Sequence, residues 1–230
     1  MTLKVVVQPV DVASLDEIPA VAVAICINGN IEQRHLALLV KPYGASSHFL
    51  IHHGWDGPNY FYCDPPEGRY CWVSLSNLDP LLVETFADHV FEVWRTNQWT
   101  GVPYGVAYHS IQYIDPDRRL VELETGQGLT CATFVLECFA AYKLPVVDRE
   151  TWPVRPEDAA WVTQILDSLA RRNPGSAVAQ RVHAGTVARF RPEEVAAAAG
   201  LFDGVPVPFH PALVMSGDVL AQMKAHGRLG

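Results

Sequence analysis

The sequence predicts an α+β fold in which an antiparallel sheet is followed by helices. The first supporting observation is a series of short β-rich runs: Val5–Val7, Val21–Ile27, His35–Val40, His48–His52 and Tyr70–Leu75. Turn-forming residues separate neighbouring runs, as at 28–30 and 42–47, and this arrangement favours an antiparallel meander. The second observation is the helical periodicity that follows.

Helical periodicity begins at Pro80. Within 80–97, apolar residues recur at intervals of three and four, which is typical of one face of an amphipathic helix: Leu82, Phe86, Val90, Phe91 and Trp94. A second helix is expected to begin near Thr130, a good N-cap residue, and to end before Pro145. Its buried stripe comprises Phe134, Val135, Cys138, Phe139 and Tyr142.

The last third of the chain is alanine-rich and interrupted by turn residues. Helices are expected over Pro156–Arg172, Pro192–Ala199 and Gly217–Ala225. We therefore divide the chain into a core over residues 1–148, which carries the chemistry, and a helical extension over 149–230. The extension is expected to pack on the core as an addition rather than as a catalytic unit.

Composition places the chain among globular proteins and argues against several functions. Of its 230 residues, 49% are hydrophobic and 18% are charged. The net charge of −8 argues against a nucleic-acid partner, because such proteins cluster Lys and Arg on one face. No apolar run approaches the roughly 18 residues of a membrane span, and the first residues lack the apolar region of a signal peptide. We expect a soluble, cytoplasmic protein.

Cysteine usage points to a reducing compartment. The five cysteines are odd in number and include no CxxC pair, so the sequence suggests neither a disulfide framework nor a zinc ribbon. We predict no cofactor and no metal. The weaker alternative is a zinc site built from His48, His52, His53 and Asp56, but residues 52 and 53 face opposite sides of a strand.

Cys131 is the candidate nucleophile. It follows the glycine-containing segment 126–130 and lies in the first turn of the predicted helix. Exposed N–H groups and the helix dipole stabilise a thiolate there, which predicts a lowered pKa, and the same N–H groups can bind an oxyanion. The competing interpretation is that Cys131 is a small core residue, as Cys138 in the helix interior is expected to be.

A thiol nucleophile needs a base, and histidine is the usual one. His35 opens an apolar strand and is placed to face the helix that carries Cys131. The next strand offers His48, His52 and His53 as the residue that orients His35. A hairpin about Gly44 brings His35 opposite residues 51 to 53. Since 48 and 52 share one face, this favours His52 over His48 and leaves His53 on the other face.

The order of these residues resembles the circularly permuted branch of the NlpC/P60 superfamily of papain-like cysteine peptidases, which includes relatives of lecithin retinol acyltransferase. The segments 35–40, 50–52 and 130–135 are similar to that branch's histidine strand, orienting strand and nucleophile helix, over about residues 30 to 145. The resemblance implies a permuted papain-like fold. It also implies that the tyrosine of the segment 101–105, Tyr104, lines the oxyanion site.

The leading hypothesis is a cysteine peptidase or amidase that cleaves a peptide or isopeptide bond through a thioacyl-enzyme. Cys131, His35 and His52 are its catalytic residues, and Tyr104, Thr130 and Trp55 are candidate substrate-binding residues. The substrate partner is then peptide-like or acyl in nature. Thiol-dependent acyl transfer or lipid-ester hydrolysis at the same site is an alternative, and so is a catalytically inactive binding module.

Trp55 lies in the turn-rich segment 54–59, which we place at the rim of the cleft. A tight turn with a partly buried tryptophan is the simpler interpretation of that segment.

Around the cysteine, threonine and alanine replace the acidic residue and serine of many NlpC/P60 relatives, which leaves the substrate type open.

Overall fold

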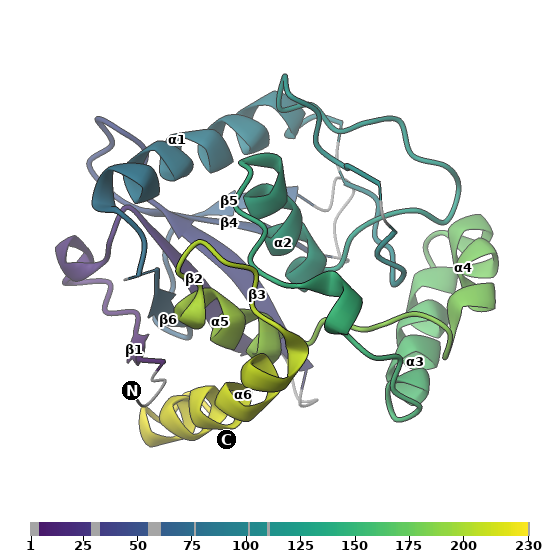
Figure 1. Ribbon diagram of the computed structural model, residues 1–230. Coiled ribbons are helices and arrows are strands. Elements are labelled where there is room, and N and C mark those ends of the chain that lie inside the picture. The colour runs from purple at the N-terminus through teal and green to yellow at the C-terminus, as the bar shows by residue number, and fades with distance from the viewer. Residues whose placement is uncertain are drawn as a thin grey trace.

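The computed structural model describes residues 5–28, 33–54, 61–75, 77–100, 102–109 and 111–229. Within these ranges the chain is an α+β protein with six antiparallel strands in one sheet and six α-helices (Figure 1). The strands are β1 Val7–Pro9, β2 Val21–Asn28, β3 Gln33–Val40, β4 Phe49–His53, β5 Phe61–Asp64 and β6 Cys71–Ser74. The helices are α1 Pro80–Asn97, α2 Cys131–Ala141, α3 Asp158–Ala170, α4 Pro174–Gln180, α5 Pro192–Leu201 and α6 Phe209–Ala225. The predicted α+β class is confirmed.

The sheet is more than a meander. Strands β2, β3 and β4 follow one another as neighbours, as predicted, and β5 pairs with β4, but β6 returns to pair with both β1 and β2. The sheet order is therefore β1-β6-β2-β3-β4-β5. This places β3, which carries His35, in the interior of the sheet, where its register is fixed on both sides.

The two faces of the sheet pack differently. Alternate residues such as Val23, Leu36 and Ile51 face α1, α2, α5 and α6 in one large apolar core. The residues between them, such as Ala24, Ala37 and Leu50, form a smaller cluster with Tyr70 and Trp72 on the other face. Because β2 and β3 are buried on both faces, their sequences are apolar without alternation, as in 21–27 and 36–40.

Helix α5 belongs to the main core. Its residues 195–199 are fully buried among β2, β3 and β6. Gly200 permits this close approach, because a Cβ at this position would lie 2.7 Å from Val5 and 2.8 Å from Val73. The predicted extension over 149–230 thus places α5 at the centre of the molecule, and α6 packs on the same core. Helices α3 and α4 lie to one side, away from the sheet (Figure 1).

Three elements differ from the sequence-based prediction. Strand β5 was not predicted, and neither was α4, where Asn173-Pro174-Gly175 suggested a turn. In the structure Asn173 caps α4 through a hydrogen bond from the Ser176 amide (3.1 Å), and Pro174 occupies the first helical turn, where its missing N–H costs nothing. Helix α6 begins at Phe209, earlier than the predicted Gly217, because Pro211 also falls within a first turn.

Candidate active site

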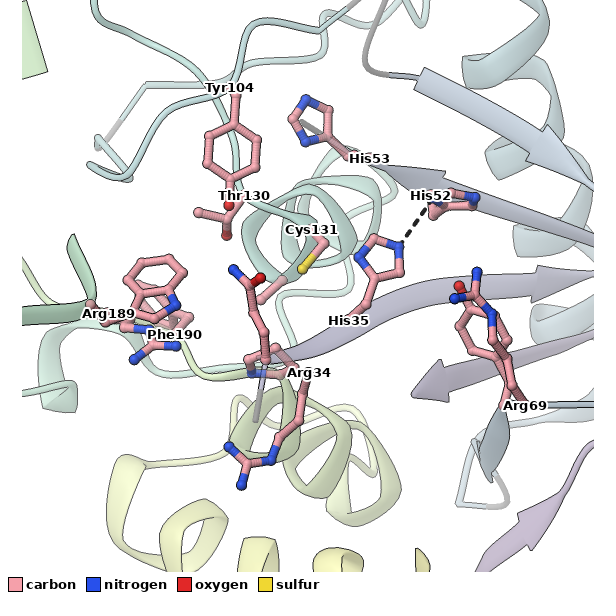
Figure 2. A pocket seen from close by; sticks show the side chains of 16 residues that line it. Arg34, His35, His52, His53, Arg69, Tyr104, Thr130, Cys131, Arg189 and Phe190 are labelled. Carbon is pink, nitrogen blue, oxygen red and sulfur yellow. Dashed lines mark hydrogen bonds between the residues drawn. The ribbon is translucent and has the colours of Figure 1, made fainter. Parts of the chain in front are cut away.

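One pocket gathers most of the predicted site residues (Figure 2). Cys131, His35, His52, Tyr104 and Thr130 all contribute to its wall. The remaining described residues of the wall are Gln33, Arg34, His53, Gly54, Arg69, Tyr70, Ala132, Trp161, Arg189, Phe190 and Pro192. Trp55, the other predicted substrate-binding residue, lies outside the described residues, as does Asp56.

The start of α2 fixes Cys131 at the pocket. Thr130 is the N-cap, as predicted, and its hydroxyl accepts a hydrogen bond from the Thr133 amide (3.2 Å). The Thr133 hydroxyl in turn accepts one from the Thr130 amide (2.7 Å), so two threonines form a reciprocal capping box. Cys131 is therefore the first helical residue, and its half-buried side chain lies among backbone N–H groups.

Two glycines position the approach to α2. The backbones at Gly105 and Gly128 touch, since a Cβ at Gly128 would lie 2.4 Å from the Pro103 carbonyl oxygen and 2.7 Å from the Gly105 nitrogen. The Leu129 amide donates to the Pro103 carbonyl (2.9 Å) and the Gly105 amide to the Leu129 carbonyl (3.2 Å). This short parallel pairing holds Tyr104 beside the residues that lead into Cys131.

A chain of hydrogen bonds runs from His35 away from the cysteine. His35 Nε2 lies 3.1 Å from His52 Nδ1, and His52 Nε2 lies 2.9 Å from a carboxylate oxygen of Asp64. The observed register pairs Ala37 with His52, so His35, two residues earlier on the same face, reaches His52 diagonally. Asp64 comes from β5, the strand that the sequence did not predict, and pairs there with Leu50.

Asp64 determines which nitrogen of each histidine carries the proton in this series of hydrogen bonds. An ionised carboxylate can only accept, so His52 Nε2–H donates to it. Neutral His52 then accepts at Nδ1, and His35 donates to it from Nε2. The remaining nitrogen of His35, Nδ1, is left as an acceptor, and Figure 2 shows it on the side of the ring that faces the Cys131 sulfur. His35 is thus in the tautomer that a general base requires.

The other two candidate histidines have different partners. His48 is buried and its Nε2–H donates to the Pro19 carbonyl (3.0 Å), which ties the start of β4 to the segment before β2. His53 lines the pocket, but its Nε2–H donates to the Val102 carbonyl (2.8 Å) and its ring stacks on Tyr104. Of the three, His52 is the one that contacts His35.

Burial dominates the electrostatics of the pocket. It lowers the pKa of His35 to about 3, with a smaller contribution from His52, and it lowers the pKa of His52. It also raises the pKa of the Cys131 thiol, and this outweighs the opposing effect of the backbone N–H groups at Leu36 and Ala132. The predicted lowering of the thiol pKa is therefore wrong. The resting pair is a neutral thiol and a neutral imidazole.

The C-terminal third of the chain completes the pocket. Trp161 from α3 and the segment of Arg189, Phe190 and Pro192 form one wall. Phe190 fixes that segment by stacking on Trp152 (centroids 5.2 Å apart) and meeting Tyr108 edge-on (5.6 Å). Sequence analysis missed these residues and Asp64. Aspartate in the strand after a histidine pair was a usable signal, whereas nothing local distinguishes Arg189.

The described residues contain no group of three or more His, Cys, Asp or Glu side chains arranged to hold a metal ion. They also contain no helix with the length and apolar character needed to cross a bilayer.

Comparison with known proteins leaves the site to be interpreted from its own geometry. No protein-family model matches the chain, no curated protein is significantly similar to it, and no solved structure resembles it significantly.

Proposed function

We propose that this protein is a cysteine hydrolase that cleaves an amide bond through a thioacyl-enzyme at Cys131, with the permuted papain-like fold of the NlpC/P60 superfamily. The observation that carries the proposal is the meeting of two features in one pocket. These are a cysteine at a capped helix N-terminus and a histidine whose tautomer is set by a second histidine and a carboxylate. Nucleophile, base and orienting group are the parts that thiol-dependent acyl chemistry requires.

In the acylation step, the Cys131 sulfur attacks the substrate carbonyl carbon while its proton passes to Nδ1 of His35. Because both groups are neutral at rest, proton transfer accompanies attack rather than preceding it. Backbone N–H groups at the start of α2 are available to the oxyanion. His35 then protonates the leaving nitrogen, the C–N bond breaks, and a thioester remains on Cys131.

In the deacylation step, a water molecule gives a proton to His35 as its oxygen attacks the thioester carbonyl. The C–S bond breaks, the carboxylic acid leaves, and the proton returns to the sulfur. Acyl transfer to an acceptor other than water follows the same path, with the acceptor replacing water in this step.

The pocket wall supports a peptide-like substrate more than a lipid. Its described members include three arginines and three histidines around the cysteine, and such a polar wall suits the polar amide groups of a peptide better than a fatty acyl chain. The five free cysteines also suit a thiol enzyme of a reducing compartment, which favours the cytoplasm.

Alkylation kinetics test the proposal without a known substrate. The rate of iodoacetamide labelling at each cysteine is measured by mass spectrometry between pH 5 and 10 on wild type, His35→Ala and Asp64→Asn. Cys131 is expected to label fastest. Since burial raises its pKa above 9.0, its rate should still be rising at pH 9, whereas a thiol with a lowered pKa would reach a plateau earlier.

The variants separate catalysis from mere exposure. Loss of the His35 base should slow Cys131 labelling strongly, and Asp64→Asn should slow it about tenfold, the equivalent of one charge-assisted hydrogen bond. Cys63 is half-buried and is not part of the pocket wall, so it serves as the internal control. Labelling of Cys131 that ignores His35 would rule out the hydrolase and favour a binding module.

A further inference from the structure

The pocket wall is rich in cationic groups although the protein is acidic. Arg34, Arg69 and Arg189 line it, and its described residues include no aspartate or glutamate, whereas the whole chain has a net charge of −8. A concentration of one charge sign in a cleft favours ligands of the opposite sign. The three arginines differ, however, in how they are held.

Two of the three are engaged with glutamates. Arg69 donates to Glu67 from Nε (2.6 Å) and from Nη2 (3.4 Å), and both side chains are close to half exposed. Arg34 forms an ion pair with the buried Glu193 (3.4 Å). Their charges are therefore largely compensated within the protein.

Arg189 is held rigidly, with most of its donors unused. Its guanidinium lies over the Trp161 ring, 3.6 Å from the centroid, and Nη1 donates to Asp158 (3.0 Å). Asp158 is shared, because Arg155 and Arg191 also donate to it. Of the five N–H donors of Arg189, four have no protein acceptor among the described residues, although its side chain is only 19% exposed.

We propose that Arg189 is a specificity residue that binds a carboxylate of the substrate next to the scissile bond. The inference rests on the proposed function and names its substrate class: amides with a free carboxylate near the bond that is cleaved. The stacked, tethered guanidinium presents a planar pair of donors, which matches a carboxylate in two parallel hydrogen bonds.

Arg189 is near enough to act on the reacting groups. Its charge lowers the pKa of Cys131 and of Tyr104, against the larger opposing effect of burial on both. Burial also lowers the pKa of Arg189 itself, which means that the guanidinium has lost part of its water shell. An anionic ligand replaces the hydrogen bonds that the guanidinium has lost to water. The site should therefore prefer a ligand with a carboxylate over a neutral ligand of the same shape.

Two alkylating reagents of the same shape test the inference. Iodoacetate and iodoacetamide both transfer a substituted methyl group to the thiolate with loss of iodide, but only iodoacetate carries a carboxylate. The quantity measured is the ratio of their rates at Cys131 at pH 8 and low ionic strength. In the folded wild type we expect this ratio to be about tenfold higher than at the same cysteine in urea, the equivalent of one charge-assisted contact.

Variants locate the effect. Arg189→Gln should remove most of the tenfold preference, and Arg189→Lys should keep part of it. Asp158 retains Arg155 and Arg191 in both variants, so the fold is expected to survive, and circular dichroism checks this. Arg69→Gln is the matched control, because it removes a pocket arginine whose charge Glu67 already compensates. It should change the ratio less than twofold.

Each outcome has one meaning. An unchanged ratio in Arg189→Gln, or an equal fall in Arg69→Gln, overturns the assignment of the carboxylate site to Arg189. The hydrolase proposal stands or falls separately, on whether the iodoacetamide rate depends on His35. If that dependence is absent while the ratio still depends on Arg189, the pocket binds carboxylates without catalysis.

Discussion

The first turn and the interior of helix α2 carry the same residue type in two different environments. Cys131 begins the helix, is half-buried, and lines the pocket among backbone N–H groups. Cys138, seven residues later, is fully buried in the main core, and burial raises its pKa well above the usual value. The reactivity of a thiol in this helix therefore depends on its position. Only the first turn provides both nearby backbone N–H groups and access to the pocket.

The largest expected contrast is between the two cysteine variants. Cys131→Ala should abolish turnover and leave the free energy of unfolding within about 1 kcal/mol of wild type, because a half-buried sulfur leaves little cavity. Cys138→Ala should spare activity and lower the unfolding free energy by about 1 kcal/mol through a methyl-sized cavity. Urea denaturation and the turnover rate measure the two effects. Retained activity in Cys131→Ala would remove the basis of the comparison.

A second contrast tests the approach to α2 against an ordinary helical position. Gly128→Ala should lower the unfolding free energy by about 3 kcal/mol and slow Cys131 labelling, because the new Cβ would displace the Pro103 and Gly105 backbones. Gly217→Ala in α6 meets nothing within 4 Å and should raise stability by up to about 1 kcal/mol. Thermal or urea unfolding of the pair gives both values. Equal effects would mean that the backbone contact at Gly128 does not position the cysteine.

A third contrast, in stability and not in reactivity, concerns Glu137 in the interior of α2. The buried carboxylate of Glu137 accepts hydrogen bonds from the Tyr108 hydroxyl and the Tyr113 amide, both 2.8 Å, and so ties the loop before α2 to the helix. Glu137→Ala should lower the unfolding free energy by about 2 kcal/mol without changing the iodoacetamide rate at Cys131.

The pH dependence of this loss has a definite sign. Burial raises the pKa of Glu137 above its ordinary 4.5. The carboxyl group therefore stabilises the fold most below pH 4.5, and part of this contribution is lost as the pH rises through the folded pKa. The difference between wild type and Glu137→Ala should narrow between pH 4.5 and pH 7.5 in urea titrations. A difference that widens would mean that the carboxylate is stabilised in its charged form.

Local signals predicted the elements on which the site stands. The bounds of α1 and the Thr130 cap of α2 follow from periodicity and capping chemistry, which depend on residues three or four apart. The common face of His35 and His52 follows from the two-residue period of strands. The sequence predicted a lowered pKa for Cys131, but burial raises it. The helix terminus is a local property, whereas burial depends on the whole fold.

What the sequence alone determined is therefore the order of the candidate residues His35 and Cys131 and the elements that carry them. Only the tertiary structure decided that Asp64 ends the histidine chain, that α5 fills the core, and that Arg189 and Trp161 wall the pocket. The physical reason is range. Helix and strand periodicity depends on residues a few positions apart, so it can be recognised in the sequence. Arg189 and His35 line the same pocket only because elements far apart in the sequence pack together.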